Sequence, residues 1–434
     1  MNQPNPPSRC RTLMIAAPSS GQGKTTVVAG LARHLRNLGQ RVRVFKMGPD
    51  FIDPMIHERA SGAPVYQLDL WMMGEAHCRA LLNEAAAEAD WLLLESVMGL
   101  YDGNPSSAEF SRRFGIPVAL LIDGSAMAQT FGALAFGLSQ FEPLHCAGVI
   151  ANRVNSDGHA TYLKESLRDG LPFIGRLPVN PDLALPERHL GLVTAAEISD
   201  LEARLDACAR WIAEANLQLP DAFLDPTPAA PAFPPTDLLK GMRIAIARDA
   251  AFCFLYHANV RWLESAGAQL IYFSPLHDSD LPDADALYLP GGYPELHLDT
   301  LANNTHMIEQ IRAHHQADKP LLAECGGLLY LLESLRDAAG HTRDMVGLVP
   351  GQGVMHSRLF GIGMQALPRP SGELRGHGFH YGEWINGPAV PLQTIPARRM
   401  SRPEAVYQDG RLTASFTHWY FPSAPDSAAQ LFRG

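Results

Sequence analysis

Apolar residues in the first half of the chain occur in short runs that alternate with longer Ala- and Leu-rich stretches. The apolar, β-branched runs predict strands at residues 12–16, 42–45, 91–94, 118–122, 148–150 and 173–174. Helical stretches lie between them, including residues 26–38, 77–88 and 162–167. Because strands alternate with helices, the pattern predicts a parallel sheet with helices on both faces.

A proline-rich stretch interrupts this pattern at residues 217–238 and predicts an extended, semi-rigid connector. A second series of apolar runs then follows at 242–247, 270–273, 286–289 and 320–324. We therefore predict an α/β fold in two domains. The predicted boundaries are 1–218 for the first domain, 219–240 for the linker and 241–434 for the second domain.

Composition narrows the class of protein. The 434 residues carry a formal net charge of −10, which argues against general nucleic-acid binding because that needs a basic face. No apolar run approaches the length of a membrane span, and the first run is too short for a signal peptide. The six cysteines have neither metal-site nor disulfide-framework spacing, so we expect a cytoplasmic protein.

A Gly-rich loop joins the first predicted strand to the first predicted helix. It reads Ala17-Pro18-Ser19-Ser20-Gly21-Gln22-Gly23-Lys24-Thr25. In such a loop, backbone N–H groups bind phosphate oxygens, the lysine adds positive charge and the hydroxyl binds Mg²⁺. We therefore predict an ATP site made by Gly21, Gln22, Gly23, Lys24, Thr25 and Thr26.

Two positions qualify this interpretation. Pro18 stands where the first glycine of the GxxxxGK[ST] pattern belongs, and the alternative is a Gly/Ser-rich turn that merely precedes a helix. Ser19 stands where one subfamily of phosphate-loop proteins has a lysine that reaches into a partner's nucleotide. We therefore do not expect that dimer mechanism.

Polar residues follow several strands of the first predicted sheet. Asp50 and Asp53 come after the second predicted strand, Glu95 ends the third, and Asp102 follows in the next loop. Ligands of open α/β sheets bind at this edge, and carboxylates there are natural Mg²⁺ ligands. We predict Thr25, Asp50 and Glu95 as the metal ligands; the alternative for each acid is a solvated loop carboxylate. Asn152 is a candidate to bind adenine or, equally, a turn asparagine.

The second domain carries a candidate nucleophile. Residues 320–330 read as strand, sharp turn and helix, and the turn presents Cys325 at the helix N-terminus. We expect this position to lower the pKa of the thiol. His418 is the candidate base, and Gly292 and Gly326 are candidates for the oxyanion hole. Alternatively, the cysteine is a buried small residue, the histidine is structural and the Gly292 loop is only a turn.

Together these segments resemble the cobyrinate or hydrogenobyrinate a,c-diamide synthases of cobalamin biosynthesis. The matching segments are the phosphate loop, GPDFIDP at 48–54, ESVMGLYDG at 95–103, PGGYPE at 290–295, AECGG at 323–327, ASFTH at 414–418, and GHGFHY at 376–381, which is similar to the family's RGHEFHY stretch. The resemblance runs from Leu13 to Phe421. It implies an N-terminal domain similar to dethiobiotin synthetase and a C-terminal class I glutamine amidotransferase domain.

The resemblance also implies roles for residues. Cys325 is then the glutamine nucleophile, with His418 increasing its nucleophilicity; Tyr420 replaces the triad Glu of many relatives, and no role passes to Gly378, where the family has Glu. Positions tied to activity in the family match Asp50, Phe51, Ile52, Glu95 and Asp102, and Asp53 belongs to the same segment. The implied substrates are ATP, glutamine and a corrinoid, with Mg²⁺ as cofactor.

Other activities stay open at this point. Cobyric acid synthase and nickel-sirohydrochlorin a,c-diamide synthase are related amidases, and a phosphate-loop ATPase switch is an alternative from another class. The sequence does not decide between cobyrinate and hydrogenobyrinate, or between a monomer and a homodimer.

Overall fold

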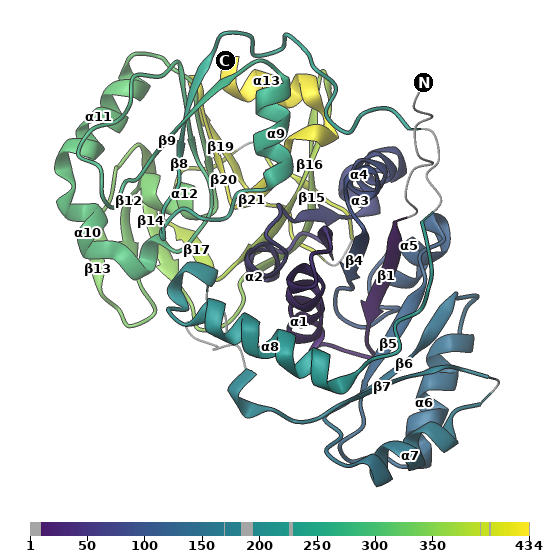
Figure 1. Cartoon of the computed structure of the whole chain (residues 1–434). Helices are drawn as coiled ribbons and strands as arrows, with labels where there is room; N and C mark the ends of the chain where they lie inside the picture. Colours follow the sequence, from purple (N-terminus) through teal and green to yellow (C-terminus); the bar gives the residue numbers. More distant parts are fainter. Residues whose placement is uncertain are drawn as a thin grey trace. The chain divides into compact units, whose positions relative to one another are not determined.

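The computed structural model describes residues 10–168, 170–183, 194–224, 229–390, 392–398 and 401–433. The chain divides into two compact units, residues 1–232 and 233–434, each with its own sheet and core (Figure 1). Within the described ranges, no helix has the length and apolar character needed to cross a bilayer.

The N-terminal unit is built on a seven-stranded parallel sheet, counted over the described residues, with the strand order β3-β2-β4-β1-β5-β6-β7. Its strands are β1 (Arg11–Ala16), β2 (Val42–Met47), β3 (Tyr66–Leu68), β4 (Trp91–Glu95), β5 (Val118–Asp123), β6 (Cys146–Asn152) and β7 (Phe173–Leu177). Its helices are α1 (Lys24–Asn37), α2 (Ile52–Ser61), α3 (Leu70–Met73), α4 (Glu75–Glu88), α5 (Ser107–Phe114), α6 (Gln129–Gln140), α7 (Asp157–Ser166) and α8 (Leu201–Ala215). The predicted alternation of strand and helix is confirmed.

Strand order explains which helices share a face. The chain moves in one direction along the sheet through α1 and α2, and in the opposite direction through α4 to α7. Right-handed crossovers therefore place the two sets of helices on opposite faces (Figure 1). Helix α8 packs on the same face as α1 and α2, and the apolar side chains of these three helices form one core with the sheet. The carboxyl ends of β1, β2 and β4 consequently meet at one edge.

The C-terminal unit contains a sheet of order β19-β20-β11-β10-β8-β9, which is parallel except at its edge strand β19. These strands are β8 (Arg243–Ala247), β9 (Gln269–Phe273), β10 (Ala286–Leu289), β11 (Leu321–Glu324), β19 (Val406–Asp409) and β20 (Leu412–Ser415). The helices are α9 (His257–Ser265), α10 (Leu298–Asn303), α11 (Thr305–Gln316), α12 (Gly326–Leu331) and α13 (Pro425–Arg433). The predicted second α/β unit is confirmed.

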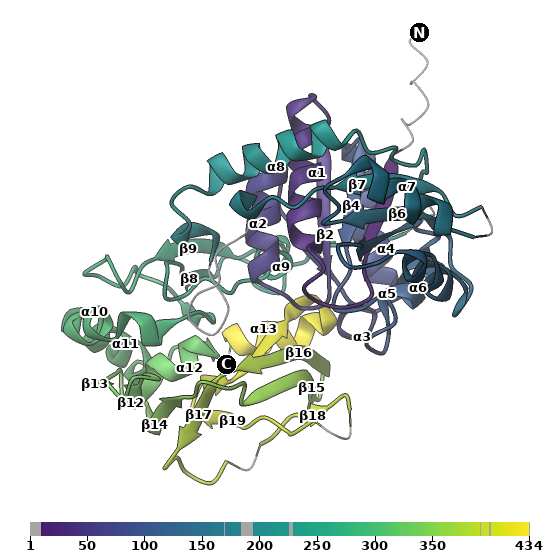
Figure 2. The ribbon, with the colours of Figure 1, turned by 90° about the horizontal axis from the view of Figure 1, so that it is seen from below.

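Among the described residues, this unit has two further four-stranded sheets, which have no counterpart in the sequence-based prediction. One has the order β13-β12-β14-β17 and the other is antiparallel with the order β18-β15-β16-β21 (Figure 2). Their strands are β12 (Leu332–Arg336), β13 (Thr342–Asp344), β14 (Val349–Met355), β15 (Gly361–Arg369), β16 (Gly372–His380), β17 (Gly382–Ile385), β18 (Ile395–Pro396) and β21 (Thr417–Tyr420). Strand β21 carries His418.

Part of the predicted linker is paired with the N-terminal unit. Phe223 forms an antiparallel bridge with Arg11, and the backbone N–H of Leu224 donates to the carbonyl of Cys10. Residues 225–228 of the predicted linker lie outside the described residues.

Candidate functional site

The Gly-rich loop lies between β1 and α1, as predicted. Gly21 and Gly23 have φ angles of 77° and 90°, and Gly23 is the residue that precedes α1. This left-handed conformation favours glycine, which explains the two glycines of the loop. Pro18, the departure from the GxxxxGK[ST] pattern, lies close to the loop after β4: its carbonyl oxygen would lie 2.5 Å from a Cβ added at Gly99. Thr26 follows in the first turn of α1.

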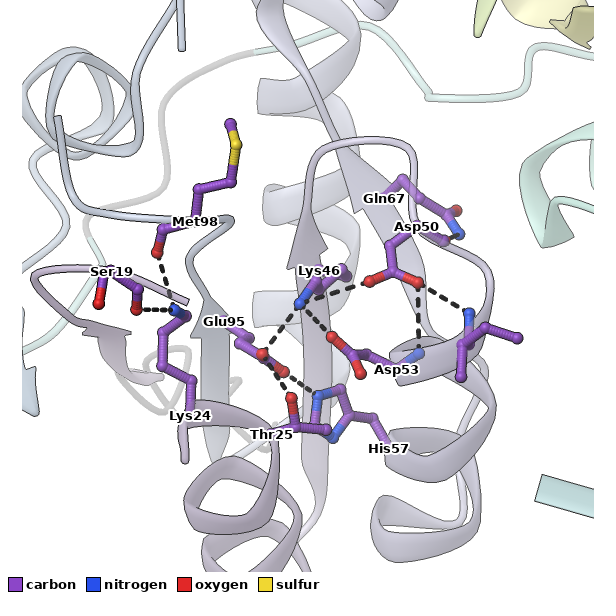
Figure 3. A network of polar contacts seen from close by, with 11 residues as sticks. Ser19, Lys24, Thr25, Lys46, Asp50, Asp53, His57, Gln67, Glu95 and Met98 are labelled. Atoms are coloured by element: carbon purple, nitrogen blue, oxygen red, sulfur yellow. Dashed lines mark hydrogen bonds and ion pairs between the residues drawn. The ribbon is translucent and has the colours of Figure 1, made fainter. Parts of the chain in front are cut away.

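Lys24 connects the phosphate loop to the loop after β4. Its Nζ donates to the carbonyl oxygens of Ser19 at 3.0 Å and Met98 at 2.7 Å (Figure 3). Burial lowers the pKa of Lys24, although the charge of Glu95 opposes this shift. The two hydrogen bonds hold the Lys24 ammonium beside the phosphate loop, where phosphate oxygens would bind.

Glu95 is the centre of a buried polar network (Figure 3). Its Oε1 accepts hydrogen bonds from Thr25 Oγ1 and Lys46 Nζ, both at 2.9 Å, and its Oε2 contacts His57 Nε2. Burial alone would raise the pKa of Glu95, but the charge of Lys46 and the hydrogen bond with His57 lower it well below its usual range. Glu95 is therefore a carboxylate at neutral pH.

Lys46 lies at the end of β2 and joins three carboxylates. Its Nζ contacts Asp53 Oδ2 and Glu95 Oε1, and lies 3.6 Å from Asp50 Oδ2. Burial disfavours the ammonium, yet the carboxylates raise the pKa of Lys46 above its usual value. A buried cation is tolerated here because it is paired several times.

The predicted GPDFIDP segment forms the start of α2. Asp50 Oδ1 accepts hydrogen bonds from the backbone N–H groups of Ile52 and Asp53, at 2.8 and 3.3 Å, and so stabilises the first turn; Phe51 precedes the helix. Burial, followed by the neighbouring Asp53, raises the pKa of Asp50 to about 7. The segment therefore places Asp50 and Asp53 beside Lys46.

The residues present fit Mg²⁺. Neighbouring ligands of an octahedral ion at about 2.1 Å lie about 2.9 Å apart. Thr25 Oγ1 and Glu95 Oε1 are 2.9 Å apart. Mg²⁺ ordinarily takes one or two carboxylates and completes its coordination with substrate phosphates and water, which suits a site beside a phosphate loop.

Two other predicted residues stabilise the phosphate loop and the loop after β4 by hydrogen bonds. Asn152 Nδ2 donates to the carbonyl of Gln22 at 2.8 Å, and Gln22 Oε1 accepts from the backbone N–H of Asp123. Asp102 Oδ2 accepts from the backbone N–H of Gly99 at 2.8 Å. In the described conformation, Asn152 holds the phosphate loop and Asp102 holds the loop that faces Lys24.

The C-terminal unit presents Cys325 at a strained turn. Cys325 has φ 47° and ψ −102° and lies between β11 and α12; its backbone N–H donates to the carbonyl of Ser415 at 2.8 Å. Strain of this kind at a non-glycine residue is frequent at functional sites. The predicted strand, turn and helix around the thiol are therefore present.

Glycines at the turn bring Cys325 and His418 together. A Cβ added at Gly291 would lie 2.3 Å from His418 Cε1 and 3.4 Å from Cys325 Cβ, so both side chains flank this residue. A Cβ added at Gly326 would lie 2.8 Å from the backbone nitrogen of Gly292. The four predicted residues of the glutaminase site thus gather around one point.

The expected low pKa of the thiol is wrong for this structure. Burial raises the pKa of Cys325 well above its usual value, and the charge of Glu295 adds to the shift. Helix α12 has only six residues, and its effect on the thiol is smaller than the cost of burying a thiolate. Burial, with the nearby His377 and His380, lowers the pKa of His418 to about 3. The resting pair is therefore a neutral thiol and a neutral imidazole.

We predict that Gly291→Ala disables glutamine hydrolysis. The added methyl group would overlap the His418 ring, and a displacement of about 1 Å can cost about 10²-fold in rate. Glutamate release measures the effect, with Gly382→Ala as control because its Cβ would meet only flexible side chains, the nearest at 3.3 Å. Equal activity of both variants would contradict the placement of His418.

We also predict that His418 makes the protein sensitive to acid. Its pKa is about 3 in the folded state, against about 6.5 for an ordinary histidine, so the unfolded chain binds the proton first. The contribution of neutral His418 to the free energy of unfolding is fully present above about pH 6.5 and is lost as the pH falls toward 3. At pH 5 the loss is about 2 kcal/mol. Urea unfolding at pH 7 and 5 should show a smaller acid loss in His418→Asn than in wild type. His341→Asn, an exposed position, should behave as wild type.

Three buried polar residues of these sites were not predicted. Lys46 and His57 contact Glu95, as described above. Glu324 accepts hydrogen bonds from Tyr288 Oη and from the backbone N–H of Trp419, at 2.7 and 3.1 Å, and so ties the strand before Cys325 to the residue after His418. The sequence signal for Lys46 and Glu324 was a charged residue inside or at the end of an apolar strand, whereas His57 lies on α2 and had no such signal.

Two protein-family models match the chain. Residues 13–193 match the CobQ/CobB/MinD/ParA nucleotide binding domain. Residues 243–425 match the CobB/CobQ-like glutamine amidotransferase domain. Each match falls within one of the two units.

Full-length relatives agree with these matches. The chain is 56% identical to the hydrogenobyrinate a,c-diamide synthase of Stutzerimonas stutzeri, over 98% of this chain and 99% of the relative. It is 54% identical to the hydrogenobyrinate a,c-diamide synthase of Pseudomonas aeruginosa, over 98% of both chains. It is 50% identical to the cobyrinate a,c-diamide synthase of Herminiimonas arsenicoxydans, over 99% of this chain and 98% of the relative.

Proposed function

The chain belongs to the family of cobyrinate and hydrogenobyrinate a,c-diamide synthases, and from this membership we propose how its two units divide the reaction. The protein is a ligase of cobalamin biosynthesis. It uses ATP and glutamine to amidate the a and c acetate carboxylates of cobyrinate or hydrogenobyrinate. The observation that carries the proposed division is that one unit holds a phosphate loop and the other holds Cys325 and His418 around a single glycine.

The C-terminal unit releases ammonia from glutamine. His418, neutral at physiological pH, accepts the thiol proton as Cys325 Sγ attacks the amide carbon. The proton passes to the leaving nitrogen, ammonia departs and a thioester remains. Water then hydrolyses the thioester to glutamate and restores the thiol. The backbone N–H groups of Gly292 and Gly326 stabilise the oxyanion.

The N-terminal unit activates the acid. A corrinoid carboxylate does not react with ammonia at neutral pH, because its leaving group would be oxide. The carboxylate oxygen therefore attacks the γ-phosphorus of ATP, and the products are an acyl phosphate and ADP. Lys24 and the loop N–H groups, from Gly21 to Thr26, neutralise the phosphate charge. Mg²⁺, held by Thr25 and Glu95 with Asp50 nearby, supplies further charge neutralisation when bound.

Ammonia then displaces phosphate from the acyl phosphate and leaves the amide. Two such cycles consume two ATP, two glutamines and two waters. Residues 50–53 and Asp102 belong to the part of this site that binds the corrinoid substrate. The names of the three relatives reported above favour the a,c-diamide activity over the cobyric acid, nickel tetrapyrrole and ATPase-switch alternatives.

The test is a product analysis by mass spectrometry. The purified chain is given ATP, Mg²⁺ and glutamine with hydrogenobyrinate or with cobyrinate, and reactions without ATP or without glutamine are the controls. We expect a monoamide followed by a diamide from at least one corrinoid. Failure with both corrinoids, by a chain that still hydrolyses glutamine, would overturn the assignment of substrate.

We further propose a cytoplasmic location. Supporting it, none of the six cysteines, all of which are described residues, is in a disulfide, which suits a reducing compartment.

A further inference from the structure

His57 is a buried histidine that the proposed mechanism does not use. It lies on α2 with no exposed surface, and its Nε2 contacts Glu95 Oε2 (Figure 3). Among the described residues, its Nδ1 is buried and has no hydrogen-bond partner. The ring therefore has one polar contact, which is with the carboxylate beside the phosphate loop.

This environment selects one tautomer. A proton on Nδ1 would leave a buried N–H donor unsatisfied, and the ring would then face the carboxylate with a lone pair. A proton on Nε2 is donated to the carboxylate, and only the lone pair of Nδ1, an acceptor, is then without a partner. His57 accordingly donates Nε2–H to Glu95 Oε2.

The hydrogen bond fixes the orientation of the carboxylate. The terminal torsion of a glutamate is broad, so its two oxygens exchange positions easily unless both are held. Here Oε2 is held by His57, and Oε1 faces Thr25 Oγ1 and Lys46 Nζ, each at 2.9 Å. Partners behind a metal-binding carboxylate typically contribute 10- to 100-fold to metal affinity.

We propose that His57 is a positioning residue that holds Glu95 with Oε1 toward Thr25, in the orientation that binds the metal of the Mg²⁺–ATP complex. The inference rests on the proposed function, because it takes Thr25 and Glu95 as the metal ligands. His57 touches neither ATP nor the reacting carboxylate in this role.

The test measures ATP binding by calorimetry, without glutamine or corrinoid, in Mg²⁺ and in EDTA. His57→Leu and His57→Phe remove the donor, and we expect them to raise the Kd of ATP about 10- to 100-fold in Mg²⁺. The Kd in EDTA should stay unchanged. His57→Gln keeps an N–H donor and should bind ATP in Mg²⁺ nearly as wild type does. His159→Leu is the control, since the His159 ring lies in the same unit and contacts the carbonyl oxygen of Met127 rather than a carboxylate.

Each result decides the question. A folded Leu or Phe variant with wild-type affinity in Mg²⁺ would overturn the proposal, as would a Gln variant as weak as the Leu variant. If neither the Leu nor the Phe variant folds, the Gln variant alone tests the proposal. Loss of the Mg²⁺ dependence of its ATP affinity would then contradict a donor role for His57. Should wild-type affinity itself not depend on Mg²⁺, the proposed metal site fails rather than the role of His57.

Discussion

Replacing Cys325 with alanine is expected to abolish glutamine-dependent amidation while ammonia-dependent amidation survives. Without the thiol no thioester forms, and loss of a catalytic nucleophile costs at least about 10³-fold. Ammonium salt bypasses this step, because the phosphate loop and the Glu95 network lie in the other unit. Amide formation from each nitrogen source, measured at saturating ATP, gives the two rates.

Cys146→Ala is the matched control for that experiment. Cys146 is a partly buried thiol on β6 of the N-terminal unit and belongs to neither predicted site, so its loss should leave both rates unchanged. Loss of both routes in Cys325→Ala would mean that the thiol serves the synthetase reaction or the fold. Survival of both would mean that another group releases ammonia.

Replacing Lys24 with alanine is expected to give the reverse pattern. The ammonium is the charge that the phosphate loop offers to ATP, and removing one such group from a preorganised site costs about 10²- to 10³-fold. Amidation should fall by that factor with glutamine and with ammonium salt alike. Glutamate release should persist, since Cys325 and His418 belong to the other unit.

Lys164→Ala controls for the loss of a positive charge, because Lys164 is an exposed lysine on α7. It should leave both activities intact. If Lys24→Ala retained ammonia-dependent amidation, the loop would not be the ATP site. If it lost glutamate release as completely as amidation, the two activities would not be separable by unit.

The sequence predicted best those features that depend on residues adjacent to one another in the chain. The phosphate loop is contiguous, and its glycines are required by positive φ angles at Gly21 and Gly23. The turn at Cys325 is equally local, since strand, cysteine and Gly-Gly follow one another. Glu95 could be singled out as a candidate because it ends an apolar strand. Alternating strands and helices predicted the N-terminal sheet because parallel strands need helical crossovers.

Other features depend on contacts between distant segments, and no local pattern encodes them. Lys46 and Glu95 are 49 residues apart, and His57 and Glu95 are 38 apart. Lys46 and Glu95 meet because β2 and β4 are neighbours in the sheet, and His57 reaches Glu95 from helix α2. Strand β15 was missed because it begins Gly361-Ile362-Gly363, which has little apolar alternation. The helix start at Cys325 was visible in the sequence, whereas the burial that raises the pKa of the thiol was not.

The buried, protonated state of Cys325 has a consequence for the handling of this protein. Oxidants and alkylating agents attack the thiolate, and a thiol that is 6% exposed with a raised pKa offers very little of it. We therefore expect the Cys325 sulfur of the resting enzyme to react slowly with peroxide, and to become more reactive when its proton is transferred during turnover.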